Sequence, residues 1–254
     1  MHGTGAETGD KYRSKSIVVV GAHAFDAEAM AGATAAAAIA AGHRVTLVHL
    51  TRGERGNPLR DPAVYGKQLE SEMARAAAAF GAEYLWPGYP SGRLPGEEEL
   101  ASELAAIFKR CRADVLITHW RGSWHPRHLQ AHQAVMRAVG MISETQEPPW
   151  VFFGENCEDL EGFAPDVYVD VSHTAEKAWR AMGEYELFRR ESSPDAAGRT
   201  VKIPYEPYYR SMAAVRGVEA GVLYAQAFRL ARVVLPLPPG VGRGKPGLRP
   251  VRVF

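Results

Sequence analysis

Two short segments of this chain carry imidazole and carboxylate side chains at spacings that suit a divalent metal ion. His23 and Asp26 lie three residues apart, and His125 and His128 form a second pair with the same spacing. These groups are zinc ligands, and a catalytic zinc site uses three protein ligands and keeps one position open. Because the chain has 9 histidines, a His-x-x-His pair is weak support by itself, and hydrogen-bonded loop histidines are the alternative.

The elements that must position these residues favour the metal site. The continuous β-branched run at 16–22 is typical of a buried parallel strand, and 114–119 (DVLITH) is predicted as another strand. Each strand ends shortly before one of the two segments. In the common doubly wound sheet the first and fourth strands are neighbours, and ligands bind at the carboxyl ends of the strands near that point. We therefore expect both segments to line one crevice.

Predicted strands and helices alternate along the rest of the chain. Further strands are predicted at 43–50, 83–86, 150–154 and 167–171, and helices at 26–41, 61–80, 97–112, 128–142 and 217–230. This order predicts a single α/β domain over 16–230, with a mostly parallel sheet and helices on both faces. The Pro- and Tyr-rich segment 203–209 is expected to be irregular. Residues 1–15 are expected to be flexible, and 231–254 to form a Pro/Gly-rich tail.

Composition argues against several classes of function. The 30 Lys and Arg residues balance 29 Asp and Glu, so the chain lacks the basic excess of a nucleic-acid binder. It has no signal-peptide core and no apolar run that could span a bilayer. Two cysteines, Cys111 and Cys157, cannot form a cysteine zinc site, and the turn 21–26 lacks the glycines of a dinucleotide site. We expect a soluble, cytoplasmic protein with a small-molecule partner and no nucleic-acid or membrane partner; a homo-oligomer remains open.

Several motifs together resemble the PIG-L/LmbE-like metal-dependent N-deacetylases. They are 22–28 (AHAFDAE), 50–56 (LTRGERG), 114–119, 125–128 (HPRH), 165–171 and 224–228 (YAQAF), and the likeness covers most of 16–230. The resemblance implies a Rossmann-like fold and removal of acyl groups from amino sugars or amine conjugates. It also implies that His23, Asp26 and His128 bind zinc or another divalent transition metal. His125 would be the cationic group that stabilises the tetrahedral intermediate or protonates the leaving amine.

The chain departs from the family pattern at four positions. Phe25 stands where the family has the first of two aspartates, its general base, and Arg127 replaces the aspartate of the His-Pro-Asp-His motif. Leu69 and Ser91 stand where the family often has an arginine and an aspartate for substrate. Zinc alone lowers the pKa of bound water to about 7, whereas a positioned base adds about 10²–10⁴ in rate. We therefore expect either a slow hydrolase or a base from elsewhere, and favour the second.

An acidic run at 154–159, directly after a predicted strand, is the source that we favour for this base. Glu155 and Asp159 are the candidates, and a solvated acidic loop is the alternative. Two other acids have simpler interpretations. Glu54 is expected to brace Arg52 or Arg55 or to hold its loop, and Glu28 to stabilise the start of a helix through the helix dipole.

Arginines and an aromatic residue near the predicted site could contact substrate. Arg52, Arg55 and Arg127 would suit an anionic group, and Trp124 could stack on a ring, although ion pairing and packing explain them equally well. The leading interpretation is a zinc-dependent hydrolase that removes an N-acyl group through attack by metal-bound hydroxide. The acyl group that we favour is N-acetyl. A catalytically idle metal- and metabolite-binding protein of the same fold, and a metal enzyme with a different reaction, are the alternatives.

Overall fold

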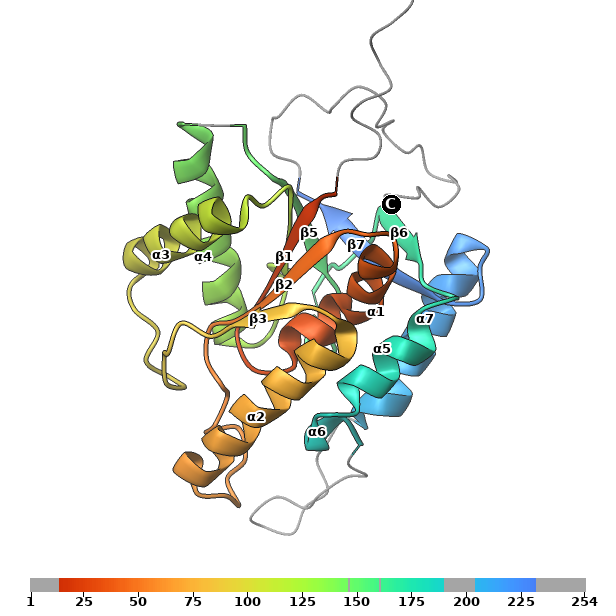
Figure 1. Ribbon diagram of the computed structural model, residues 1–254, viewed down its shortest axis with the longest axis horizontal. Helices are drawn as coiled ribbons and strands as arrows, with labels where there is room; N and C mark the ends of the chain where they lie inside the picture. The colour runs from red at the N-terminus through yellow and green to blue at the C-terminus, as the bar shows by residue number, and fades with distance from the viewer. Residues whose placement is uncertain (1–13, 146, 160, 190–203, 232–254) are drawn as a thin grey trace, which may run out of the picture.

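A seven-stranded sheet lies between two layers of helices in the computed structural model of the protein (Figure 1). The structure describes residues 14–145, 147–159, 161–189 and 204–231. The strands are β1 (Ser16–Gly21), β2 (Arg44–His49), β3 (Glu83–Leu85), β4 (Val115–His119), β5 (Trp150–Gly154), β6 (Val167–Asp170) and β7 (Ala225–Leu230). The helices are α1 (Asp26–Ala40), α2 (Pro62–Phe80), α3 (Glu97–Cys111), α4 (Pro126–Ser143), α5 (Ala175–Met182), α6 (Glu186–Arg189) and α7 (Tyr205–Ala220).

The sheet has the order β3-β2-β1-β4-β5-β7-β6. The first five strands in this order run parallel, and β7 is antiparallel to both β5 and β6. The predicted α/β class with a mostly parallel sheet is confirmed, as is the prediction that the first and fourth strands adjoin. Val20 of β1 pairs with Thr118 of β4, so the carboxyl ends of these strands lie side by side.

The central strand β1 is buried on both faces because alternate side chains enter different helical layers. Val18 and Val20 pack with residues of α3 and α4, whereas Ile17 and Val19 pack with residues of α1, α2 and α5. Figure 1 shows the same division, with α3 and α4 on one side of the sheet and the other helices opposite. The continuous apolar run of this strand reflects its position between two layers.

Two elements near the end of the chain differ from the sequence-based prediction. The segment predicted to be irregular begins α7 at Tyr205, because Pro207 lies in the first helical turn, where its missing N–H costs no hydrogen bond. The helix predicted over 217–230 is wrong beyond Ala220. Gly221, with φ +72°, ends α7, and the following residues form β7 because they find strand partners on both sides.

The two ends of the chain are largely outside this description. The predicted flexible segment 1–15 and the predicted tail 231–254 fall almost entirely outside the described residues. Within the described ranges, no helix combines the length and apolarity that crossing a bilayer requires.

Candidate metal centre

The carboxyl ends of β1 and β4 bring the two histidine segments together. One segment is the turn 22–26 between β1 and α1, and the other is the loop 120–125 between β4 and α4. His125 ends this loop as the cap of α4, where its Nδ1 accepts the Arg127 N–H at 3.2 Å and Pro126 opens the helix. His128 is in the first turn of the same helix, so α4 directs both imidazoles toward the end of β1.

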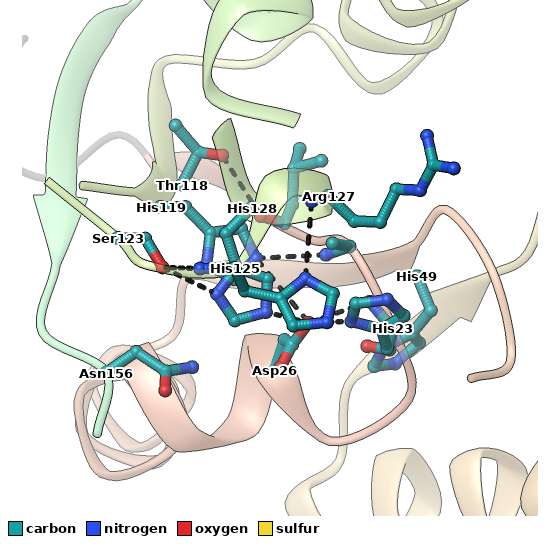
Figure 2. Close-up of polar contacts among 12 residues, drawn as sticks. His23, Asp26, His49, Thr118, His119, Ser123, His125, Arg127, His128 and Asn156 are labelled. Atoms are coloured by element: carbon teal, nitrogen blue, oxygen red, sulfur yellow. Dashed lines mark hydrogen bonds and ion pairs between the residues drawn. The ribbon is translucent and has the colours of Figure 1, made fainter. Parts of the chain in front are cut away.

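Asp26 is the centre of the cluster (Figure 2). Its Oδ2 accepts the backbone N–H of His23 at 2.8 Å and lies 3.0 Å from the Nδ1 atom of that residue. The same oxygen lies 3.3 Å from His128 Nε2 and 3.5 Å from His119 Nε2. Burial would raise the pKa of Asp26, but the imidazoles, His128 above all, hold it well below its usual value. The carboxylate is therefore ionised at neutral pH.

Two overlapping sets of side chains could hold a metal ion. In each set the potential ligand atoms lie within 4.8 Å of one another, and the sets are His23, His125 and His128, and Asp26, His119 and His128. The three predicted ligands are divided between these sets, and His128 is common to both. The donor set of imidazole and carboxylate suits zinc, so the residues present fit the group that the sequence motifs imply.

Two of the imidazoles use one ring nitrogen to accept a backbone N–H. His119 Nε2 accepts from Ala22 at 3.0 Å, and its buried Nδ1 has no hydrogen-bond partner among the described residues. Burial, then the nearby His128, lowers the pKa of His119 to about 3. Burial, then His23 and His128, lowers the pKa of His125 to about 4. Both rings are therefore neutral at pH 7, so the expected cationic form of His125 is not supported by its surroundings.

The far side of His128 faces a hydroxyl and a carboxylate. Its Nδ1 lies 3.0 Å from Ser123 Oγ and 3.4 Å from Glu158 Oε2. Burial would lower the pKa of His128, but Asp26 and Glu158 raise it above its usual value. Metal-binding histidines commonly place their second nitrogen against such a partner, which fixes the ring. The sequence analysis missed Glu158 and Ser123, although Glu158 belongs to the acidic run that was predicted to face this crevice.

The predicted base candidates in that acidic run have different surroundings. Glu155 is paired with Arg216, whose Nε donates to Glu155 Oε2 at 2.8 Å, so its carboxylate is already engaged. Asp159 Oδ2 accepts the Asn156 N–H at 2.7 Å, and its Oδ1 is buried without a partner in the described residues. Burial raises the pKa of Asp159 to about 7.

Phe25 lies in the same turn as the histidine and aspartate but its ring is packed elsewhere. The residue is 4% exposed and has φ +78°. Its ring contacts four aromatic side chains at centroid distances of 5.4–5.9 Å, namely Tyr185, Phe188, Tyr205 and Tyr209. The position of the missing family base is thus part of the hydrophobic core.

The residues predicted to contact substrate differ in exposure and in their contacts with neighbouring side chains. Arg52 lies 4.4 Å over the Trp86 ring and 3.3 Å from Glu70, so it is held by its neighbours. The Arg127 guanidinium points away from the imidazoles (Figure 2) and donates to the Gly92 carbonyl and to Gln130. By contrast, Arg55 is exposed, and Trp124, directly before His125, is 78% exposed.

The two remaining departures from the family pattern have structural partners. Ser91 donates its N–H and its hydroxyl to the carboxylate of Glu54 at 2.8 and 2.9 Å, which confirms that Glu54 holds its loop. Leu69 is buried in the core with 2% exposure.

Comparisons with known proteins agree with this geometry. Residues 18–139 match the model of the PIG-L family, described as GlcNAc-PI de-N-acetylase. The 1D-myo-inositol 2-acetamido-2-deoxy-alpha-D-glucopyranoside deacetylase of Thermobifida fusca is 30% identical over 168 residues, which are 54% of this chain and 59% of that protein. The chain spans about half the length of the curated relatives that it matches.

Solved structures share the fold over a longer part of the chain. A conserved protein of Thermus thermophilus is 25% identical, with a TM-score of 0.69 over 91% of this chain and 100% of that chain. The 4-carboxy-2-hydroxymuconate hydratase of Pseudomonas putida is 21% identical, with a TM-score of 0.71 over 88% of this chain and 99% of that chain. The family model matches the segment that carries both histidine motifs, so residues 18–139 are similar to the PIG-L family over the part of the chain that holds the site.

Proposed function

We propose that this protein is a metal-dependent N-deacetylase that acts on an amino sugar or a related amine conjugate. The observation that carries the proposal is the convergence of Asp26 with His23 and His128 at the ends of β1 and β4, within the segment that matches the PIG-L family model. The relative from Thermobifida fusca is named for deacetylation of a 2-acetamido sugar joined to inositol. That chemistry supports a small N-acetylated sugar conjugate as the substrate class.

The hydrogen bonds of the four imidazoles support His23, Asp26 and His128 as the metal ligands. His119 and His125 each have one ring nitrogen occupied by a backbone N–H, so in the neutral ring the proton is on the other nitrogen. Among the described residues, no backbone N–H donates to the rings of His23 and His128, and the ionised carboxylate of Asp26 has further lone pairs. We assign zinc to this set, and other divalent transition metals fit the same donors.

Bound there, zinc would polarise the acyl carbonyl and lower the pKa of a water molecule to about 7. The protein groups around the ligands supply the remaining steps. His125 is neutral and carries its proton on Nε2, so it can donate a hydrogen bond to the acyl oxygen as negative charge develops there. Trp124, the neighbouring exposed aromatic residue, offers a flat apolar surface for a sugar ring.

We assign the base to Asp159 rather than to Glu155. A carboxyl group with a pKa of about 7 can accept and release a proton at neutral pH, as a general base must. Glu155 is engaged by Arg216 and has no part in this assignment. Glu158 contacts His128 and is assigned to holding that ring. Of the three arginines that the sequence suggests for substrate binding, we assign the exposed Arg55 to contact an anionic group, because Arg52 and Arg127 are held by their neighbours.

The proposal is tested by acetate release from a panel of N-acetylated amino sugars and amines with the zinc-loaded protein. We expect turnover of at least one compound, and loss of both turnover and bound zinc in His128→Ala. Asp159→Asn should lower kcat by about 10²–10⁴ with zinc content unchanged. Glu155→Gln should retain the parent rate.

Other outcomes would assign a different function. Zinc bound through the three ligands, with no acetate released from any amide, would contradict the deacetylase and support the idle metal- and metabolite-binding protein. The fold is shared with a hydratase, so unsaturated carboxylic acids belong in the same panel. Hydration of such an acid without amide cleavage would replace the proposed reaction with a different one.

A further inference from the structure

A second polar cluster lies against the turn that carries His23 and Asp26, and the proposed chemistry does not use it. The side chains of Glu28 and His49 are completely buried, and Glu28 Oε1 lies 3.4 Å from His49 Nε2. Tyr185 donates its hydroxyl to the same Oε1 at 2.8 Å. A buried carboxylate is unfavourable without hydrogen-bond donors around it, so the helix-dipole role expected from sequence does not by itself explain Glu28.

His49 links this carboxylate to the backbone of the turn. Its Nδ1 lies 3.2 Å from the His23 carbonyl oxygen, and because a carbonyl only accepts, Nδ1 must carry a proton. Its Nε2 faces Glu28 and has no hydrogen bond of its own in the described residues. The group near one imidazole nitrogen fixes the orientation of the ring and the protonation of the second nitrogen. Glu28, next to His49 Nε2, therefore orients the ring so that Nδ1 faces the His23 carbonyl.

The turn needs such support because its backbone is strained. Phe25 adopts the left-handed conformation at φ +78°, which is unfavourable for a residue other than glycine and persists only where surrounding contacts impose it. Asp26 contacts both backbone groups of His23: its Oδ2 accepts the His23 N–H, and its own N–H donates to the His23 carbonyl. His49 adds a contact to the His23 carbonyl from outside the turn.

We infer that Glu28 and His49 are positioning residues that keep the His23 imidazole where it can bind the metal ion. The inference rests on the proposed function, in which His23 is a ligand. Glu28 is on α1, two residues after Asp26, and His49 ends β2, so the pair joins a helix and a strand to the turn. Without this pair the ligands would all remain, but His23 would no longer be held at one position.

The test measures zinc affinity by competition with a chromophoric chelator, in the full chain and without an activity assay. Glu28→Gln keeps an acceptor for Tyr185 but removes the negative charge. His49→Phe keeps an aromatic ring at this position but removes the N–H that faces the His23 carbonyl. We expect each variant to raise the Kd for zinc by about 10- to 100-fold, the effect usual for lost outer partners of a metal ligand. Tyr185→Phe is the matched control, because it removes the other contact to Glu28 but leaves the path to His23. It should change Kd less than about 3-fold.

A double-mutant cycle separates positioning from general damage. If Glu28 acts through His23, Glu28→Gln should have no further effect on Kd in a His23→Ala background. Folded Glu28→Gln and His49→Phe proteins with the parent Kd, or an equal effect in both backgrounds, would overturn the inference. If a variant does not fold, nitrogen NMR of the parent protein tests the inference instead. We expect a proton on His49 Nδ1, and an unprotonated Nδ1 would overturn the inference. A parent that binds zinc independently of His23 would instead contradict the proposed function.

Discussion

Phe25 stands where the family usually has its catalytic base, yet its ring is enclosed by Tyr185, Phe188, Tyr205 and Tyr209. An aspartate at this position would place a carboxylate among four aromatic rings. We expect Phe25→Asp to lower the free energy of unfolding by about 3–5 kcal/mol or more, the loss typical of a buried Phe side chain, and not to raise deacetylase turnover. Denaturant unfolding and the acetate assay check the two parts.

The control for this substitution is Phe25→Asn. Asparagine tolerates the left-handed backbone as well as aspartate does, so it shares the loss of the ring but not the buried charge. A turnover that increases by orders of magnitude in Phe25→Asp, at unchanged stability, would contradict this interpretation. It would show that the site lacks only a carboxylate at position 25.

At the same scale, sequence reasoning located the histidines better than the acids. The adjoining ends of β1 and β4 bring His23 and His128 to the same edge of the sheet, and this follows from the order of elements. Glu158 and Asp159 differ by one position, and which of them faces His128 depends on a turn in which Asp159 accepts the Asn156 N–H. Glu28 is buried because Tyr185, 157 residues away in the chain, donates to it, and no local pattern contains that contact.

At the scale of elements, the loop after β2 depends on one carboxylate. Burial would raise the pKa of Glu54, but the N–H and hydroxyl of Ser91 lower it below its usual value. The folded pKa is thus below the unfolded one, so the pair stabilises the protein above about pH 4.5 and loses this effect as the pH falls through the folded pKa. We expect Glu54→Gln to cost about 1.5–3 kcal/mol at pH 7, and the difference from the parent to shrink toward pH 3.

Denaturant unfolding at several pH values measures this dependence. Glu98→Gln serves as the control, because Glu98 forms an exposed ion pair with Arg137 and should leave the stability of the protein unchanged. A cost in Glu54→Gln that is the same at pH 7 and pH 3 would contradict the assignment of the effect to the ionised carboxylate.

The elements themselves were predictable to different degrees. β1 is a continuous apolar run, and β2 and β4 are rich in Val, Leu and Ile, because both faces of the sheet are covered, and that pattern is visible in sequence. β7 is an antiparallel strand inserted between β5 and β6, and its residues AQAFRL have no comparable run. Partners on both sides decide its structure, and they lie 55 or more residues earlier in the chain, as in the pairs Asp170–Ala225 and Gly154–Phe228. Only the tertiary fold brings them next to β7. The site was predictable because the strands that carry it belong to the first group.

At the scale of the whole molecule, metal binding should stabilise the fold, because the proposed ligands come from segments about a hundred residues apart and form no site in the unfolded chain. At 100 times Kd a ligand adds about 2.7 kcal/mol, and in a protein of this size each kcal/mol raises Tm by about 2–4 °C. We therefore expect zinc to raise Tm by about 5–10 °C in thermal unfolding. His23→Ala should lose most of this rise, whereas His43→Ala, at the opposite end of β2, should keep it. An equal rise in His23→Ala would mean that zinc binds elsewhere on the molecule.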